Sequence, residues 1–126
     1  MQKYFKQSSP VVIPTDDNKK IEEHFGIAST RSKGFSLAHM VAPPHWEEPY
    51  QTPEFDEITI MISGKKQIEI DGETVVLKAG ESLWIRKNVR IKYSNPFDAP
   101  AEYWSVCIPE FSPDTVHREQ SNDRKR

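Results

Sequence analysis

The chain has 126 residues, a formal net charge of -2 at pH 7 from 17 Lys and Arg against 19 Asp and Glu, and a single cysteine, Cys107. This length suits one domain with a modest core, and the charge balance argues against a nucleic acid or an anionic membrane as partner. One cysteine excludes an intrachain disulfide. Because no apolar run is long enough to span a bilayer or to serve as a leader, we expect a cytoplasmic protein.

The first candidate element lies at residues 15–26. Thr15 or Asp16 could cap a helix there, and Gly26 could end it, as is typical of helix termini. Only two residues of this stretch are apolar, so the helix would be a short one at the surface. A short polar strand is the alternative.

The middle of the chain predicts a succession of short strands. Proline and glycine separate its apolar runs, and Asp71-Gly72 is typical of a tight hairpin turn. The expected strands cover residues 35–41, 57–63, 65–71, 74–77, 82–86, 89–94 and 102–108. So many short strands in a chain of this length indicate an all-β sandwich or barrel.

The C-terminal part carries one more helix signal. Ser112-Pro113-Asp114 combines a cap, a first-turn proline and a first-turn acid, which predicts one or two helical turns over 115–119. Residues 120–126 are charged and lack apolar side chains, so we expect a disordered tail. The domain would then span residues 1–119.

The strand at 57–63 has no clearly polar face. Alternation places Glu57, Thr59 and Met61 on one side and three isoleucines on the other. Both sides would therefore need cover. It could come from residues 11–13 or from a second subunit, and we predict a homodimer.

Two segments resemble the two sequence motifs of the cupin superfamily. Over residues 45–64, Glu57 and Gly64 match the first motif, whereas Gln51 and Pro53 stand where that motif has its two histidines. Over residues 80–95, the second motif is matched at its opening glycine and its closing asparagine. The residues that differ there are Arg86, Asn88 and Ile91, in place of proline, glycine and histidine.

The resemblance implies a single-domain cupin β-barrel, also called a double-stranded β-helix or jelly roll. It is similar in style to cupin-type ethanolamine-utilisation proteins, which also lack the usual metal histidines. Cupins typically hold a first-row metal with three histidines and a glutamate. Here Gln51 and Glu57 remain at ligand positions, and His45 and His117 are weak further candidates. Because this set is a poor transition-metal cage, we expect no cofactor, with a loosely held divalent ion as the disfavoured alternative.

The same register predicts the lining of a pocket for a small organic ligand. Gln51, Phe55 and Tyr93 would face inward as ligand-binding residues. From the last strand either Tyr103 or Trp104 would join them, since parity alone does not choose.

Glu57 is the candidate catalytic residue. A carboxylate at a pocket wall must find partners, because an unpaired buried charge is costly. It would suit general acid–base work in an isomerase, lyase or cyclase with weak or no metal dependence. The alternatives are a non-catalytic binding protein, and a purely structural ion pair between Glu57 and Arg86, Arg90 or Lys92.

Overall fold

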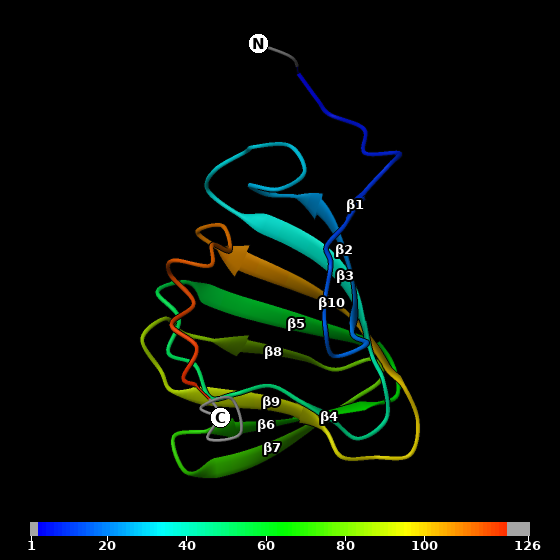
Figure 1. Cartoon of the computed structure of the whole chain (residues 1–126), viewed down its shortest axis with the longest axis vertical. Helices are drawn as coiled ribbons and strands as arrows, with labels where there is room; N and C mark the ends of the chain where they lie inside the picture. The colour runs from blue at the N-terminus through cyan, green and yellow to red at the C-terminus, as the bar shows by residue number, and fades with distance from the viewer. Residues whose placement is uncertain (1–2, 121–126) are drawn as a thin grey trace.

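Ten strands form two antiparallel sheets within residues 3–120, the part of the chain that the computed structural model describes (Figure 1). The larger sheet has the strand order β1-β2-β3-β10-β5-β8, and the smaller one the order β4-β9-β6-β7. The strands are β1 (Val11–Val12), β2 (Lys20–Phe25), β3 (Ser36–Ala42), β4 (Trp46–Glu47), β5 (Asp56–Ser63), β6 (Lys65–Ile70), β7 (Glu73–Lys78), β8 (Ser82–Ile85), β9 (Ile91–Asn95) and β10 (Ala101–Ile108).

All seven strands predicted in the middle of the chain are present, with ends shifted by at most two residues. The turn between β6 and β7 is the predicted Asp71-Gly72 pair. Both residues have positive φ, 48° and 86°, as the tight turn that matches the twist of paired strands requires. β1 and β4 are two residues long, which is too short for an alternating pattern to reveal them.

The predicted helical turn at 15–26 is wrong, and the short polar strand considered as its alternative is present as β2. The Thr15 hydroxyl donates to the Lys19 carbonyl, and the Lys19 amide donates to the Asp17 carboxylate. Thr15, one of the two candidate caps, therefore closes a local turn rather than beginning a helix. Pairing with β3 then extends the chain through residues 20–25.

The second helix prediction, over 115–119, is also wrong. One turn forms where the Thr115 amide donates to the Ser112 carbonyl at 3.1 Å, and the chain then extends. It extends because it pairs with residues 50–54, as in the 2.9 Å bond from the Glu54 amide to the Thr115 carbonyl. The described residues contain no helix that could cross a membrane. The predicted tail at 120–126 lies, apart from Gln120, outside the described residues.

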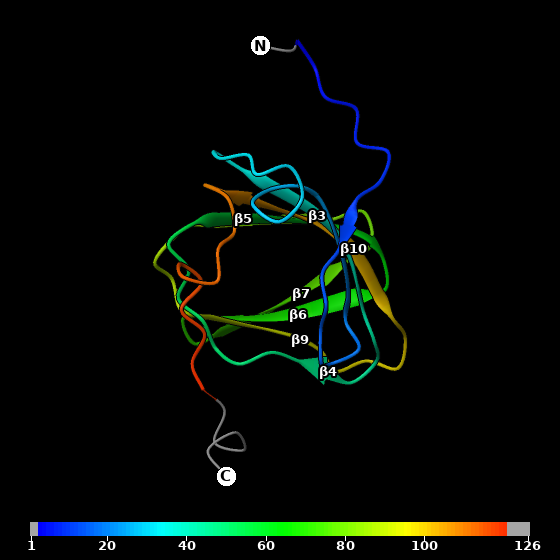
Figure 2. The same cartoon turned by 45° about the horizontal axis from the view of Figure 1, so that its top comes forward.

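The predicted all-β architecture is confirmed, but the predicted closed barrel is wrong. Two separate sheets face each other, and over residues 3–120 no ladder between named strands joins one to the other. The sides of the sandwich are covered instead by the chain ends (Figure 2). The segment before β2 lies on one side, and the segment after β10 lies on the other.

Two residues that match the cupin motifs have structural roles. Gly64 has φ of 75°, and a Cβ there would collide with the Pro100 carbonyl oxygen, so only glycine fits without strain. Asn95 is fully buried and satisfies several backbone groups at once. Its amide nitrogen donates to the carbonyls of Ala42, Pro43 and Ala99 at 3.3, 3.1 and 2.9 Å.

β5 turns its isoleucines outward. Glu57, Thr59 and Met61 are buried, whereas Ile60 and Ile62 are 43% and 42% exposed. The N-terminal segment does not cover this outer face, because Val11–Val12 pairs with β2 at the far edge of the sheet. Of the two covers considered, only a second subunit remains, and the homodimer stays a prediction.

Candidate functional site

A cavity of about 510 Å³ lies between the two sheets. Strand alternation directs both apolar and polar side chains into it. Its apolar wall includes Ile13, Ile21, Ala38, Met40, Phe55 and Phe111. Its polar groups include Lys19, Glu48, Gln51, Glu57, Lys66, Tyr93, Ser105 and Arg118. The mixture is typical of a site that encloses an organic molecule and orients it through a few polar groups.

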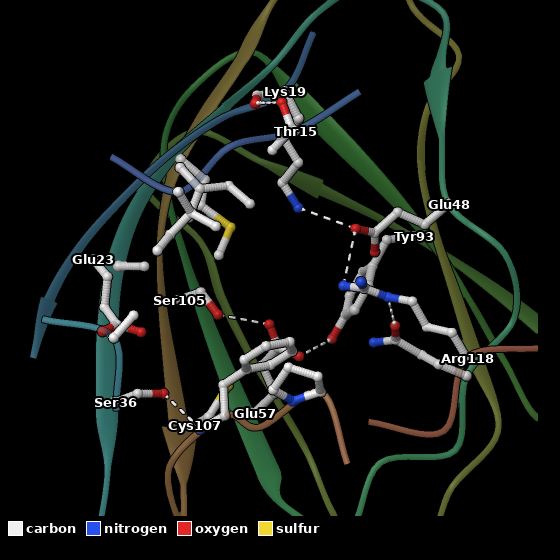
Figure 3. Close-up of a pocket in the computed structure, with 18 of the residues that line it drawn as sticks. Thr15, Lys19, Glu23, Ser36, Glu48, Glu57, Tyr93, Ser105, Cys107 and Arg118 are labelled. Carbon is white, nitrogen blue, oxygen red and sulfur yellow. Dashed lines mark hydrogen bonds and ion pairs between the residues drawn. The ribbon is translucent and has the colours of Figure 1, made fainter. Parts of the chain in front are cut away.

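Glu57 lies on the cavity wall between two neutral donors (Figure 3). The Tyr93 hydroxyl donates to Oε1 at 3.0 Å, and the Ser105 hydroxyl donates to Oε2 at 2.6 Å. The residue is 8% exposed, so these bonds replace water. Burial, followed by the nearby Glu57 charge, raises the pKa of Tyr93 well above its usual value. Tyr93 is therefore a neutral phenol that donates a hydrogen bond to the carboxylate.

A second polar cluster joins both ends of the chain to the cavity. The Lys19 ammonium lies 3.4 Å from the Glu48 carboxylate, and the Arg118 guanidinium lies 3.5 Å from the same carboxylate (Figure 3). Arg118 also donates to the Gln51 side-chain oxygen at 3.2 Å. Burial lowers the pKa of Lys19, but the Tyr103 hydroxyl and the Glu48 carboxylate together raise it by more, so the net shift is upward. Lys19 thus stays a cation, neutralised by Glu48.

Lys66 is a buried cation that our sequence interpretation missed. It is 1% exposed and lines the cavity from β6. Its Nζ lies 4.0 Å from the ring centroid of Tyr93 and 3.8 Å from that of Tyr103, distances typical of cation–π contacts. The signal was available, because Lys66 alternates in phase with the buried Ile68 along the strand.

Two further buried groups complete the interior. Tyr103 is fully buried, and its hydroxyl has no hydrogen-bond partner among the described residues. Cys107 also lines the cavity. Burial and the Glu57 charge raise the pKa of its thiol well above the usual value, although Ser36 and Ser105 lower it. Cys107 is therefore a neutral thiol, a poor nucleophile.

Most of the predicted ligand-binding residues meet at this cavity. Gln51, Phe55 and Tyr93 line it together with Glu57. The choice left open on the last strand is settled by register, because Trp104 pairs with Ile60 of the outward face.

Tyr103 therefore faces the interior, next to the cavity, whereas Trp104 lies outside it. The Trp104 ring contacts two histidines on the outer face of the sheet. Its centroid lies 5.0 Å from that of His24 and 5.1 Å from that of His39.

The residues present do not fit the metal site that the cupin resemblance implies. His45 and His117 are at the surface, where they pair with Asp98 and Glu54. Both carboxylate oxygens of Glu57 already accept hydrogen bonds from hydroxyl groups, as described above. Across residues 3–120 no group of three or more His, Cys, Asp or Glu side chains gathers as a metal site would require. We therefore derive no chemistry from a metal.

The three cations weighed as structural partners of Glu57 point elsewhere. Arg90 binds the Glu119 carboxylate at 2.7 Å, and Lys92 pairs with Glu47 at 3.2 Å. Arg86 lies over the Trp84 ring, 4.4 Å from its centroid. The structure thus offers no support for an ion pair that would make Glu57 purely structural.

Sequence comparison finds one family and one curated relative. The family model described as a cupin domain matches residues 38–108. A protein of Myxococcus xanthus named endoribonuclease YbeY is 42% identical over 113 residues. That match covers 90% of this chain but only 38% of the Myxococcus protein, so the chain spans less than half of the relative's length.

Solved structures with a similar fold include three proteins that are all distant in sequence. An RmlC-like cupin from Shewanella frigidimarina has a TM-score of 0.71 at 13% identity, covering 90% of this chain and 96% of that one. Streptomyces PAC13, solved with uridine, has a TM-score of 0.73 at 10% identity, covering 95% and 92%. The polyketide cyclase RemF from Streptomyces resistomycificus has a TM-score of 0.73 at 14% identity, covering 98% and 89%.

Proposed function

We propose that this chain, which belongs to the cupin domain family, binds a small organic ligand in the cavity between its two sheets. The observation that carries the proposal is a buried carboxylate aimed into an enclosed space. Glu57 has neutral donors on both of its oxygens and no described cation within 4 Å. A carboxylate oxygen can accept more than one hydrogen bond, so Glu57 keeps capacity for a donor on the ligand.

The size and lining of the cavity support an organic ligand. Its volume of about 510 Å³ falls within the range typical of sites for cofactor-sized and drug-sized molecules. The apolar wall would hold the body of such a molecule, while Glu57 and Gln51 would orient its polar groups. Streptomyces PAC13, which has a similar fold, was solved with uridine. A fold of this kind therefore has room for an organic molecule of that size.

The alternative is an enzyme that uses Glu57 as general acid–base without a metal. It is favoured by the Tyr93–Glu57–Ser105 arrangement, in which two fixed donors hold the carboxylate at one position. Such positioning is what proton transfer at a bound substrate needs. An isomerase, lyase or cyclase would fit, and the polyketide cyclase among the structural neighbours makes cyclisation the first reaction to assay.

The name of the Myxococcus relative does not define an activity for this chain. Endoribonuclease describes a protein of which the matched segment is 38%. The net charge of -2 is also not the strongly basic balance that is typical of nucleic-acid-binding domains.

A fragment screen with the intact protein tests the binding proposal. Saturation-transfer NMR against small organic compounds, uridine included, should find ligands, and a crystal structure should place them between Glu57 and Tyr93. Glu57→Gln should weaken those ligands at least tenfold, because a buried hydrogen bond to a charged group is lost. Glu73→Gln, at an exposed position of β7, is the matched control and should leave affinity unchanged. A panel without a single cavity ligand would overturn the proposal.

The same variant separates a binder from an enzyme. In an enzyme, Glu57→Gln should abolish turnover of an identified substrate while that substrate still binds. In a binding protein, the ligand is recovered chemically unchanged from the wild type, and only its affinity responds to the substitution.

A further inference from the structure

Among the described residues, the charged groups that line the cavity have a hydrogen-bond partner or are exposed at its rim, with one exception. Glu48 accepts both Lys19 and Arg118, as described above. Glu23 accepts the Ser29 amide at 2.7 Å, and Glu57 accepts two hydroxyls. Asp16 is exposed at the rim, where water solvates it. Each carboxylate of the lining therefore has either a donor or solvent.

Lys66 is the exception. Among the described residues no carboxylate oxygen lies within 4 Å of its Nζ, and its contacts are the faces of two tyrosine rings. Those rings offset part of the cost of burying an ammonium ion. They do not supply a hydrogen-bond acceptor of the kind that an ammonium group, with three donors, ordinarily has. A buried ammonium group that lines a cavity without an acceptor from the described residues can take one from a ligand, and an anionic acceptor suits it best.

Tyr93 connects Lys66 to Glu57. The face of its ring contacts the Lys66 ammonium, and its hydroxyl donates a hydrogen bond to Glu57. Tyr93 thus contacts a positive group on its own sheet, Lys66 of β6, and a negative group on the facing sheet, Glu57 of β5. A ligand that satisfies both must present an anionic acceptor to Lys66 and a hydrogen-bond donor to Glu57.

We propose that the ligand is a small organic acid whose carboxylate pairs with Lys66 and whose hydroxyl or amino group donates to Glu57. The inference depends on the proposed function, since it names the ligand class of the same cavity. The body of the ligand is apolar, because the lining of the same cavity includes Ala38, Met40 and Phe55. The cation that selects the ligand is then supplied by a side chain of β6.

Matched acids and amides test this proposal directly. The probes are 4-hydroxybenzoate with 4-hydroxybenzamide, and orotate with orotamide, each pair titrated by calorimetry and by saturation-transfer NMR. In the wild type, at least one acid should bind at least tenfold more tightly than its uncharged partner. This comparison needs no variant, so it does not depend on how a substitution folds.

Variants then assign the preference to one residue. Lys66→Met keeps the length of the side chain and removes its charge, so it should abolish the preference for the acid. Lys65→Met is the matched control, because Lys65 is the neighbouring residue on β6 and is exposed. The control should keep the preference intact.

The possible failures are distinguishable. Equal affinity for acid and amide in the wild type, or a preference that survives Lys66→Met, overturns the assignment of an organic acid and leaves the proposed binding function standing. If neither member of either pair binds, and the broader fragment panel also finds no cavity ligand, both proposals fall.

Discussion

The hydroxyl of Tyr93 should stabilise the folded protein through the carboxylate of Glu57. Tyr93→Phe keeps the ring that packs in the core and removes only the donor 3.0 Å from Oε1. Glu57 then keeps one donor, the Ser105 hydroxyl, while the carboxylate stays buried. The substitution therefore leaves a charged acceptor partly unsatisfied in a place that water reaches poorly.

The expected loss follows from the charge and burial of the acceptor. Hydrogen bonds to charged groups contribute about 1.5–3 kcal/mol, so Tyr93→Phe should lower the free energy of unfolding by about 2 kcal/mol. For a domain of this length, that corresponds to a melting temperature lower by roughly 6–10 °C. In a Glu57→Gln background the same tyrosine loses only a neutral partner, and the coupling between the two sites should be about 1–2 kcal/mol.

Urea unfolding of the four proteins of this double-mutant cycle, followed by circular dichroism at neutral pH, measures the coupling. Tyr50→Phe is the control, since Tyr50 also donates to a glutamate, Glu69, at 2.6 Å, but near the surface. Its loss should be much smaller. A coupling below about 0.5 kcal/mol, the usual error of such additivity tests, would refute the view that the hydroxyl serves a charged, buried carboxylate.

Three further predictions concern pH, the outer sheet and the first motif. Burial raises the pKa of Asp17, but the hydrogen bond from Trp46 lowers it, and the net shift is downward. The stability that this carboxylate contributes should therefore be fully present above about pH 4 and decline as the pH falls through the lowered pKa. Asp17→Asn should flatten this decline in acid unfolding curves. Sedimentation at micromolar concentration should show a dimer of the 14.6 kDa chain, and Ile60→Lys on the exposed face should convert it to monomer. Gly64→Ala should lower stability by at least about 1–2 kcal/mol from its positive φ alone, with the Pro100 clash added, and a melting temperature equal to wild type would contradict this.

The sequence predicted the strands better than it predicted the ends of the chain. β3 and β5–β10 follow from alternation and turn residues, which are local signals. The stretch at 15–26 carried helix-capping residues, yet it became β2 because a neighbouring strand offered a longer set of hydrogen bonds than a two-turn helix provides. A tertiary partner of this kind is invisible in a local pattern.

The site was predicted in part for the same physical reason. The cupin register placed Gln51, Phe55, Glu57 and Tyr93 in one cavity, because positions two apart on a strand share a face. Arg118 was missed because it reaches the cavity only through the pairing of the C-terminal segment with residues 50–54, a contact between distant parts of the chain. Lys66 was missed although its strand phase was readable, because a lysine next to Lys65 resembles ordinary solvent-exposed charge.

The contrast between Gly64 and Gln51 explains why the fold of this chain is clearer than its chemistry. Gly64 and Asn95 satisfy demands of the backbone, a positive φ and several buried carbonyls, that any protein with this turn and this loop must meet. Gln51 and Ile91 occupy positions that a metal would require to be histidine, and the backbone makes no such requirement. Motif residues that the backbone requires therefore indicate the architecture, whereas motif residues at ligand positions indicate only what the site binds. In this chain the residues at those ligand positions have changed, and the positive charge of the cavity now comes from Lys19, Lys66 and Arg118, so the chemistry has to be inferred from those side chains rather than from the family.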